Sequence, residues 1–284
     1  MVKLQEEGGG HGDWDNSIPV ARLSPLASFS GLVKKTLAIA EFEIRKLRHD
    51  FTELITRAAQ PVLWFILFGE VLTRARAIPT GDHAYRDFLA PGILAQSVLF
   101  VAIFYGIAII WERDLGITNK FLVSPTPRAA LVLGKALSAG VRSLSQVLIV
   151  YALALLLGVK MNWQPLALLG VLAVVVVGAA LFSTFSLIIA CLVKTRERFM
   201  GIGQVLTMPL FFASNAIYPI ELMPGWLRMI AVINPLTYEV DALRALMIRD
   251  WQSSFGIGID FVVLIATTIF LVIIGARLYP RVVI

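Results

Sequence analysis

Six long apolar segments recur along this 284-residue chain, and each is long enough to cross a lipid bilayer. A helical span needs about 20 predominantly apolar residues to cross about 30 Å of hydrocarbon. Charged residues make up only 15% of the sequence, whereas soluble domains carry roughly 25%. The sequence therefore predicts an all-α membrane protein whose surplus of apolar side chains contacts lipid. The predicted spans cover about 54–73, 88–110, 132–157, 165–192, 201–220 and 257–278.

The segment before the first span divides into two parts. Residues 1–30 are polar and glycine-bearing, with no apolar run of signal-peptide length, and this composition favours a disordered cytosolic tail ahead of a membrane domain over 31–284. Residues 31–49 place apolar side chains at helical spacing beside the first span, which predicts an amphipathic helix in the headgroup region. An ordinary soluble amphipathic helix has the same pattern. The basic residues of segment 31–49 include Lys34, Lys35, Arg45 and Lys46.

Lys and Arg are distributed unevenly among the segments that join the spans. With the amino terminus placed inside, the outside loops hold seven of the 25 basic residues and the inside segments hold the other 18. Cytoplasmic loops of membrane proteins carry an excess of Lys and Arg. The bias predicts that both termini are cytosolic, which requires an even number of spans. The same dispersal argues against a nucleic-acid-binding face, despite the formal net charge of +6.

The connection before the last span is long but apolar, running from Glu221 to Ser254. Asn234-Pro235 divides it into two segments, each too short to cross a bilayer. Apolar segments of roughly 10–14 residues are typical of interfacial or re-entrant helices. Backbone breaks at membrane depth occur where protein buries them or where they line a cavity. We therefore expect two short helices over about 222–248 that dip into the outer leaflet near a transport path.

No pattern for nucleotide hydrolysis or metal binding occurs in the sequence. There is no G-x-x-x-x-G-K-[ST] phosphate loop, and the three histidines, His11, His49 and His83, are scattered. We expect no catalytic residue, no metal site and no cofactor in this chain. The only cysteine, Cys191, lies in an apolar run and is expected to be a buried packing residue.

Ionisable side chains inside spans are costly and point to function by default. Arg142 lies about two turns into the third predicted span and can reach toward the inner surface. Glu70 and Asp260 lie toward the outer ends of their spans, where side chains can reach water. No carboxylate falls near the middle of a predicted span, which weakens the case for a proton-coupled carrier.

Several short motifs occur in a fixed order relative to the spans. They are P-G-I-L-A-Q at 91–96, E-R-D-L-G-I-T at 112–118, S-P-T-P-R at 124–128, Y-P at 218–219, N-P-L-T-Y at 234–238 and D-A-L-R at 241–244. Over roughly residues 33–280 the chain resembles the permeases of type-2 ATP-binding-cassette exporters, closest to those of daunorubicin-resistance and nodulation-factor exporters. The family pattern Glu-Arg-Glu-x-Gly-Thr is altered here, because Asp114 replaces the second Glu and Ile117 precedes Thr118.

The resemblance implies a dimer of permeases with two separate ATPase subunits, which bind ATP and Mg²⁺, docked beneath it. It also implies an elbow helix matching 31–49, re-entrant helices matching 222–248, and a coupling helix matching about 111–122 that sits in a cleft of the ATPase. The coupling helix rests on the resemblance alone, and a plain solvated connection is the alternative. The residues expected to couple to the ATPase are Glu112, Arg113, Asp114, Gly116, Thr118 and Phe121.

The function implied is export of an amphiphilic drug-like or lipid-linked molecule across a bacterial or archaeal inner membrane, from the cytoplasm or the inner leaflet. The alternatives are export of polysaccharide or glycolipid by the same machinery, an ion-coupled secondary carrier, and a membrane-embedded scaffold or enzyme subunit. Aromatic side chains are expected either to line the substrate path or to face lipid. They are Phe100, Phe104, Tyr105, Phe211, Phe212 and Tyr238.

Overall fold

The fold is that of a computed structural model, which describes residues 38, 41, 59–75, 78–80, 83–116, 128–193 and 195–279. Within these residues the regular structure is helical, without a β-strand, and one isolated backbone bridge joins Met161 to Ile248. The prediction of an all-α chain is confirmed for this part. The expected elbow residues Lys34, Lys35, Arg45 and Lys46 lie outside the described residues, as do Thr118 and Phe121.

Four helices of the described chain are long and apolar enough to cross a membrane. They are α4 (Tyr85–Asp114), α6 (Arg128–Leu156), α7 (Pro165–Leu192) and α11 (Ile257–Leu278). The bounds of α7 and α11 agree with the predicted spans. α4 begins at Tyr85, before the predicted start near residue 88, and Pro91 lies inside the helix. A proline within a membrane helix is tolerated where neighbouring helices surround the freed backbone groups.

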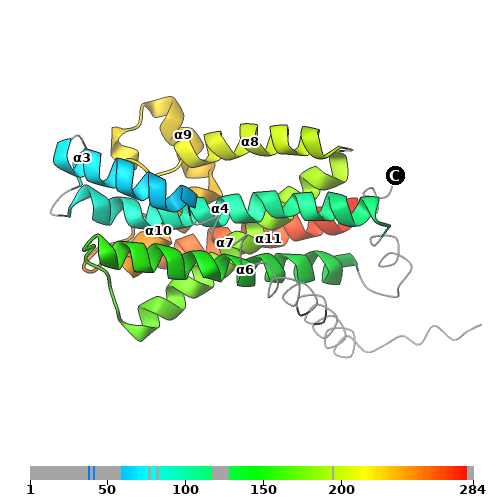
Figure 1. The fold of residues 1–284 in the computed structure, drawn as a ribbon, viewed down its shortest axis with the longest axis horizontal. Helices are drawn as coiled ribbons and strands as arrows, with labels where there is room; N and C mark the ends of the chain where they lie inside the picture. The colour runs from blue at the N-terminus through cyan, green and yellow to red at the C-terminus, as the bar shows by residue number, and fades with distance from the viewer. Residues whose placement is uncertain are drawn as a thin grey trace, which may run out of the picture.

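Helix α7 lies at the centre of the bundle. It packs against α4, α6, α10 (Pro235–Met247) and α11. α4 also contacts α6 and α8 (Arg196–Phe212), and Figure 1 shows these three helices running roughly along one another. The side chains that fill the interior are apolar and fully buried, among them Val171, Val174 and Phe182 of α7. Residues of α7 belong to both the largest buried apolar cluster of the described chain and a second, smaller one, so this helix connects the two.

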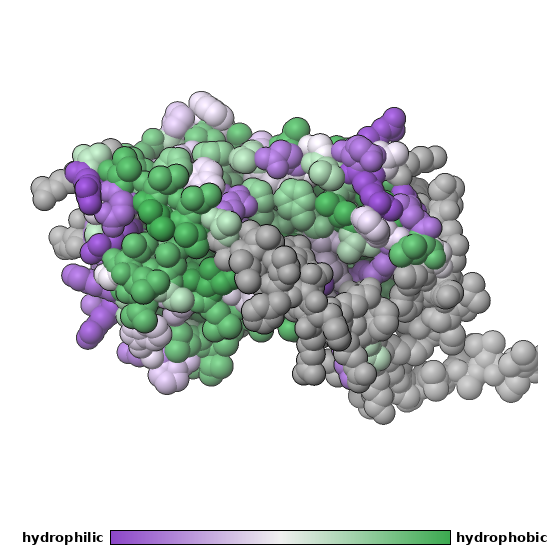
Figure 2. Space-filling model, viewed as in Figure 1, coloured by the Kyte–Doolittle hydropathy of each residue, from purple (hydrophilic) through white to green (hydrophobic). Residues whose placement is uncertain are grey.

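Large apolar side chains are also exposed on the outside of the bundle. Leu148 of α6, Leu166 of α7 and Phe270 of α11 are 75%, 81% and 61% exposed. Figure 2 shows hydrophobic residues gathered over much of the bundle's visible side, with hydrophilic residues toward its two ends. Soluble monomers rarely expose contiguous apolar surface on this scale. This distribution is that of helices surrounded by lipid.

The first and fifth predicted spans are not among the four long helices. Residues 59–75 are helical, with a π-helical turn at Phe65–Gly69 followed by α3 (Glu70–Ala75), and the predicted residues before 59 lie outside the described part. α8 has 17 residues and ends at Phe212, not near residue 220. The Asn234 amide donates to the carbonyl oxygens of Leu210 and Ala213 at 2.7 and 3.2 Å, which satisfies acceptors where α8 stops. A count of six spans stays a prediction.

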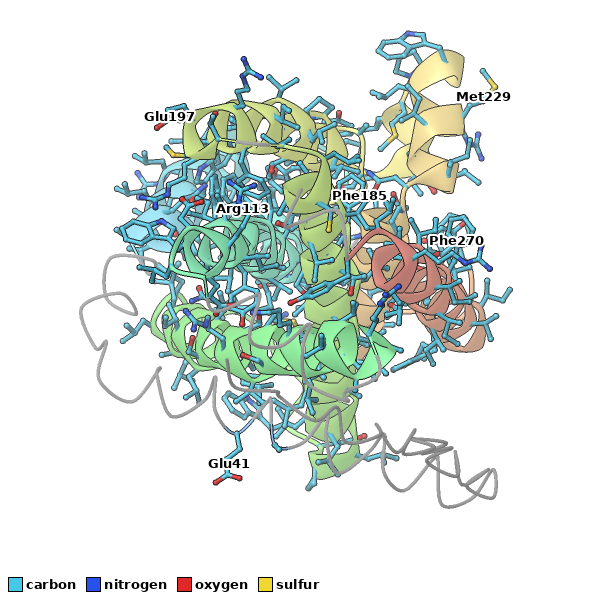
Figure 3. The ribbon with its side chains drawn as sticks, turned by 90° about the vertical axis from the view of Figure 1, so that its right-hand side faces the viewer. Glu41, Arg113, Phe185, Glu197, Met229 and Phe270 are labelled. Carbon is cyan, nitrogen blue, oxygen red and sulfur yellow. The ribbon has the colours of Figure 1, made fainter. Side chains whose placement is uncertain are left out.

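Two short helices precede α11, as the sequence predicted. α9 (Gly225–Ile233) and α10 are separated at Asn234, whose side-chain oxygen accepts a hydrogen bond from the Leu236 amide at 3.0 Å. Pro235 then occupies the first position of α10, where its missing N–H costs nothing. α10 is largely buried against α4, α7 and α11. α9 lies apart from them, and its Met229 points away from the bundle in Figure 3.

Gly92 of α4 allows a close approach of two backbones. A Cβ atom at Gly92 would overlap the backbone carbonyl group of Ala216. This clash could be relieved only by a shift of the backbone, because no flexible side chain is involved. The variant Gly92→Ala is therefore expected to lose about 1–3 kcal/mol of unfolding free energy. A thermal scan with a thiol-reactive fluorophore measures this, because Cys191 is the only cysteine and is buried.

Gly201→Ala on α8 is the matched control for that substitution. Among the described residues outside the helix's own backbone, no atom lies within 4 Å of the position that its Cβ would take. Alanine is better than glycine within a helix by about 1 kcal/mol, so this variant should be neutral or slightly more stable. Equal unfolding midpoints for the two variants would contradict the close contact at Gly92.

Candidate functional site

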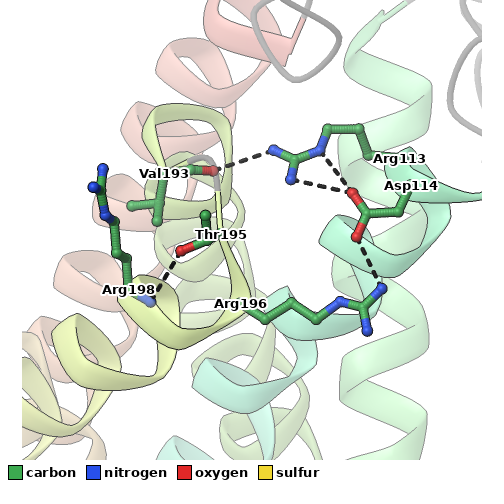
Figure 4. Close-up of polar contacts among 6 residues, drawn as sticks. All are labelled: Arg113, Asp114, Val193, Thr195, Arg196 and Arg198. Atoms are coloured by element: carbon green, nitrogen blue, oxygen red, sulfur yellow. Dashed lines mark hydrogen bonds and ion pairs between the residues drawn. The ribbon is translucent and has the colours of Figure 1, made fainter.

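One end of the bundle, here called the Asp114 end, contains a network of charged side chains. Asp114, the last residue of α4, accepts hydrogen bonds from Arg113 at 3.3 Å and from Arg196 at 2.9 Å. Arg113 also donates to the carbonyl oxygen of Val193 at 3.2 Å. Figure 4 shows that these contacts join the end of α4 to the segment that leads into α8. The ends of two helices that are far apart in sequence are thus fastened together.

Two further contacts hold the start of α8 in place. The Arg196 guanidinium lies 3.8 Å from the centre of the Trp111 ring, a cation–π contact to α4. The Thr195 hydroxyl oxygen accepts a hydrogen bond from the Arg198 amide at 3.4 Å and so caps α8. The end of α4 and the start of α8 are therefore in contact through both an ion pair and a cation–π pair.

Glu112 lies in the same turn of α4 but faces the interior. It is 5% exposed, and its carboxylate accepts a hydrogen bond from the Lys135 ammonium of α6 at 2.5 Å. The sequence suggested that Glu112 would offer a charge to a partner, but the structure buries that charge in an ion pair within the chain. Lys135 was missed, although an ionisable residue within the third predicted span was a usable signal.

A glycine lies two residues after the end of helix α4. Gly116 has φ of 70°, a left-handed conformation that glycine adopts at helix ends without a steric penalty, and no atom of the described residues lies within 4 Å of where a Cβ would stand. The residues from 111 to 114 are the final turn of α4 itself. The family resemblance implied that these residues would begin a separate coupling helix over about 111–122. The remainder of that segment, 117–122, lies outside the described residues.

The aromatic residues expected along a substrate path fall into separate groups. Phe100 and Phe104 of α4 lie together, with ring centres 6.0 Å apart, beside a cavity of about 340 Å³. Tyr105 faces another way: it is buried, and its hydroxyl is 3.4 Å from that of Ser138 on α6. The structure therefore does not bring all six side chains to one wall.

The other three expected aromatics lie in the second half of the chain. Phe211 is fully buried and contacts Trp64, whose ring centre is 5.8 Å away, whereas Phe212 is 42% exposed. Tyr238 of α10 donates a hydrogen bond to the Val232 carbonyl oxygen at 2.7 Å. It also lies against the ring of Phe255, at 5.0 Å between centres. All three side chains therefore contact other aromatic rings of the described chain: Phe211 and Phe212 pack against Trp64, and Tyr238 packs against Phe255.

Two carboxylates, those of Asp260 and Glu239, are buried although the sequence did not predict their burial. Asp260 was expected to reach water, but it is fully buried, and its side chain accepts a hydrogen bond from Ser253 at 3.0 Å. Glu239 of α10 is also fully buried, and its carboxyl group lies against Gly178 at the middle of α7. No carboxylate lies near the middle of a predicted span, but α10 brings the carboxyl group of Glu239 from outside the spans to the middle of α7. Glu70 pairs with Arg74 at 3.6 Å on the surface, as its expected exposure requires.

The opposite end of the bundle carries a buried guanidinium. Arg244 of α10 is 2% exposed and donates to the carbonyl oxygens of Phe88 and Asn215, at 3.4 and 2.8 Å. Its guanidinium lies 3.8 Å from the centre of the Phe88 ring. It lines a cavity of about 450 Å³ together with Trp251 and other residues. Arg244 thus connects α10 to α4 and to the turn after α8.

The fold and these sites define a multi-pass helical membrane protein in which two helix ends are joined through charged contacts. The chain belongs to the ABC-2 type transporter family, whose model matches residues 34–248. Its relatives are transport permeases, and the chain is a permease, not an enzyme.

Three relatives illustrate the range of the family. The transport permease ycf38 of Cyanophora paradoxa is 31% identical over 229 residues, which cover 78% of this chain and 77% of that protein. The daunorubicin resistance ABC transporter permease protein DrrB1 of Streptomyces coeruleorubidus is 26% identical over 200 residues, 70% of each chain. A doxorubicin resistance permease protein, DrrC of Mycobacterium tuberculosis, is 23% identical over 216 residues, 75% of this chain and 76% of that one.

Proposed function

We propose that this chain is the membrane subunit of an ATP-driven exporter that carries an amphiphilic, drug-like or lipid-linked molecule out of the cytoplasm or the inner leaflet. The observation that carries the proposal is the family match over residues 34–248. The names of two relatives, which refer to daunorubicin and doxorubicin resistance, support an amphiphilic drug-like cargo. The sequence has no phosphate loop of its own, so a separate ATPase, present in two copies with ATP and Mg²⁺, is the source of energy. A second copy of the permease completes the assembly in the inner membrane.

The Asp114 end is the proposed contact with the ATPase, on the cytosolic side. Transmission of a motion requires an element that contacts the partner differently in two states. We assign this role to Arg113, Asp114 and Arg196, because they lie at one end of the bundle and their contacts join α4 to α8. Pressure on this end would shift two helices as one unit. Glu112 acts from within, by keeping α6 attached through Lys135.

The test is to co-express the permease with a candidate ATP-binding-cassette ATPase from the same genome and to measure ATP hydrolysis of the complex in lipid. We expect the ATPase to copurify and the Asp114→Arg variant to lower permease-stimulated hydrolysis and transport by about tenfold or more, because the reversed charge repels Arg113 and Arg196. Asp250→Arg is the control, since Asp250 is an exposed acid away from the Asp114 end. Normal stimulated hydrolysis and transport in Asp114→Arg would refute the coupling role, and failure of any ATPase to bind would refute the proposed function.

An ion-coupled carrier is the second candidate, because Glu239 provides a buried carboxyl group against the middle of α7. Intramembrane carboxylates are common in proton relays. This candidate predicts solute flux driven by a proton gradient in vesicles that contain only this chain. It also predicts that Glu239→Gln abolishes that flux. The ATPase-driven exporter predicts no flux in such vesicles.

A further inference from the structure

The cavity beside Phe100 lies among the middle parts of the long helices. It is lined by two residues of the first helix, four of α4 and one of α6, and has a volume of about 340 Å³. Phe100 is near the midpoint of the 30-residue helix α4. The lining residues are Gln60, Pro61, Ser97, Phe100, Val101, Phe104 and Gln146. None of these described residues carries a charge.

Gln146 lines this cavity and is buried without a hydrogen-bond partner among the described residues. It is 1% exposed, and neither its amide nitrogen nor its amide oxygen has a hydrogen-bond partner among the described residues. Buried polar side chains in proteins are nearly always hydrogen-bonded, and each exception calls for an explanation. A buried amide that lines a cavity and has no partner among the described residues is suited to bind a polar group that enters the cavity.

Two further polar groups border the same space. The Ser97 hydroxyl donates to the Ile93 carbonyl oxygen at 2.8 Å, which leaves the hydroxyl oxygen able to accept a bond. Gln60 brings a second amide from the first helix. Amide and hydroxyl groups donate and accept without charge, so they match hydroxyl and carbonyl groups better than ions. Arg142 lies one turn from Gln146 on α6 and is not among the residues that line the cavity; its guanidinium is 5.3 Å from the centre of the Tyr105 ring.

The aromatic side chains provide the apolar part of the site. The rings of Phe100 and Phe104 are tilted by 31° to each other and border the cavity beside the amides. Binding sites for small molecules typically combine apolar walls with a few convergent polar groups. We propose that this cavity binds the uncharged, hydroxyl-bearing head group of an amphiphile, with Gln146 as the principal hydrogen-bonding residue and Phe100 and Phe104 against its apolar faces. This assignment rests on the proposed export function for its role in transport.

The experiment measures saturable binding of radiolabelled octyl β-glucoside, kept below its micellar concentration, to the permease in lipid nanodiscs without an ATPase. Empty nanodiscs provide the background. Octyl phosphate and octyltrimethylammonium serve as charged competitors with the same chain. We expect Gln146→Leu to weaken binding about tenfold through the loss of its hydrogen bonds. The charged competitors should displace the label less well than unlabelled octyl β-glucoside.

Thermal stability separates binding from a structural role. Because Gln146 has no partner in the described chain, Gln146→Leu should leave the unfolding midpoint unchanged or raise it. A lower midpoint would mean that Gln146 makes a structural hydrogen bond, and the proposal would be wrong. Phe100→Leu is the second variant and should also weaken binding. Thr268→Val of α11 is the control, because the Thr268 hydroxyl bonds only the Leu264 carbonyl oxygen among its described neighbours, away from the cavity.

The outcomes separate this proposal from the exporter function. Binding that depends on Gln146, in a chain to which no ATPase binds, would keep the site and refute the exporter. If the permease stimulates an ATPase but Gln146→Leu leaves the binding of octyl β-glucoside unchanged, the exporter function stands and the proposed Gln146 site is refuted. Stronger competition by octyl phosphate would assign recognition to Arg142 and overturn the choice of an uncharged ligand.

Discussion

Replacing Lys135 with methionine is expected to lower the free energy of unfolding by about 3 kcal/mol. The Glu112 carboxylate would lose the ammonium 2.5 Å from it while its side chain stays buried. Breaking a buried ion pair from one side is costly because the remaining charge is left in a medium that solvates it poorly. In a thermal scan that follows Cys191, the midpoint should fall by about 6–12 °C.

A double variant isolates the pair itself. Glu112→Met combined with Lys135→Met removes both charges, and apolar residues of similar size often replace a buried ion pair without loss of stability. We therefore expect the double variant to recover most of what Lys135→Met loses. Arg74→Met is the control, since Arg74 pairs with Glu70 at 3.6 Å on the surface and should change stability by less than about 0.5 kcal/mol. A double variant that loses the sum of the two single effects would contradict the coupling.

Arg244→Leu should cost about 3 kcal/mol at the other end of the bundle, because one guanidinium connects three segments. The substitution removes the hydrogen bonds to the carbonyl oxygens of Phe88 and Asn215 and leaves both acceptors buried. It also removes the contact with the Phe88 ring. The unfolding midpoint and the yield of folded protein both measure the loss.

Two companion variants define what Arg244 contributes. Arg244→Lys keeps the charge but lacks the planar fork that reaches two carbonyl groups, so its stability should lie between those of the wild type and Arg244→Leu. Arg228→Leu on the neighbouring helix α9 removes an exposed arginine and should change stability by less than about 0.5 kcal/mol. If Arg244→Leu unfolds at the same temperature as Arg228→Leu, the buried contacts have no stabilising role.

The long helices could be read from the sequence because apolar length is a local property. The predicted spans 165–192 and 257–278 coincide with α7 and α11, where Pro165 and Gly256 mark the helix starts. The break at Asn234-Pro235 was likewise predicted, since a proline cannot continue the preceding helix. The end of α8 at Phe212 was not, because the acceptors there are satisfied by Asn234, which is remote in sequence.

The candidate sites depend more on tertiary contacts. The sequence pointed to Asp114 and Arg113 through a motif, but it assigned Glu112 the same exposed role. Both glutamate and aspartate suit a cytosolic surface, and only the packing of α4 on α6 turns Glu112 toward Lys135. Phe100 and Phe104 were named among six aromatics, yet nothing in the sequence separated them from the packing residues. Gln146 was missed because an amide within a span has no charge to draw attention to it.

By itself the sequence determined that this chain lies in a membrane as a set of helices, because bilayer thickness and the cost of exposed backbone polar groups leave few alternatives for such apolar stretches. Its ordered motifs also determined the family. Only the tertiary structure decided which polar side chains meet: the fastening of Asp114 to Arg196, the burial of Glu239 against Gly178, and the cavity around Gln146. The physical reason is that side-chain pairing depends on how helices distant in sequence rotate and pack together, which no local pattern specifies.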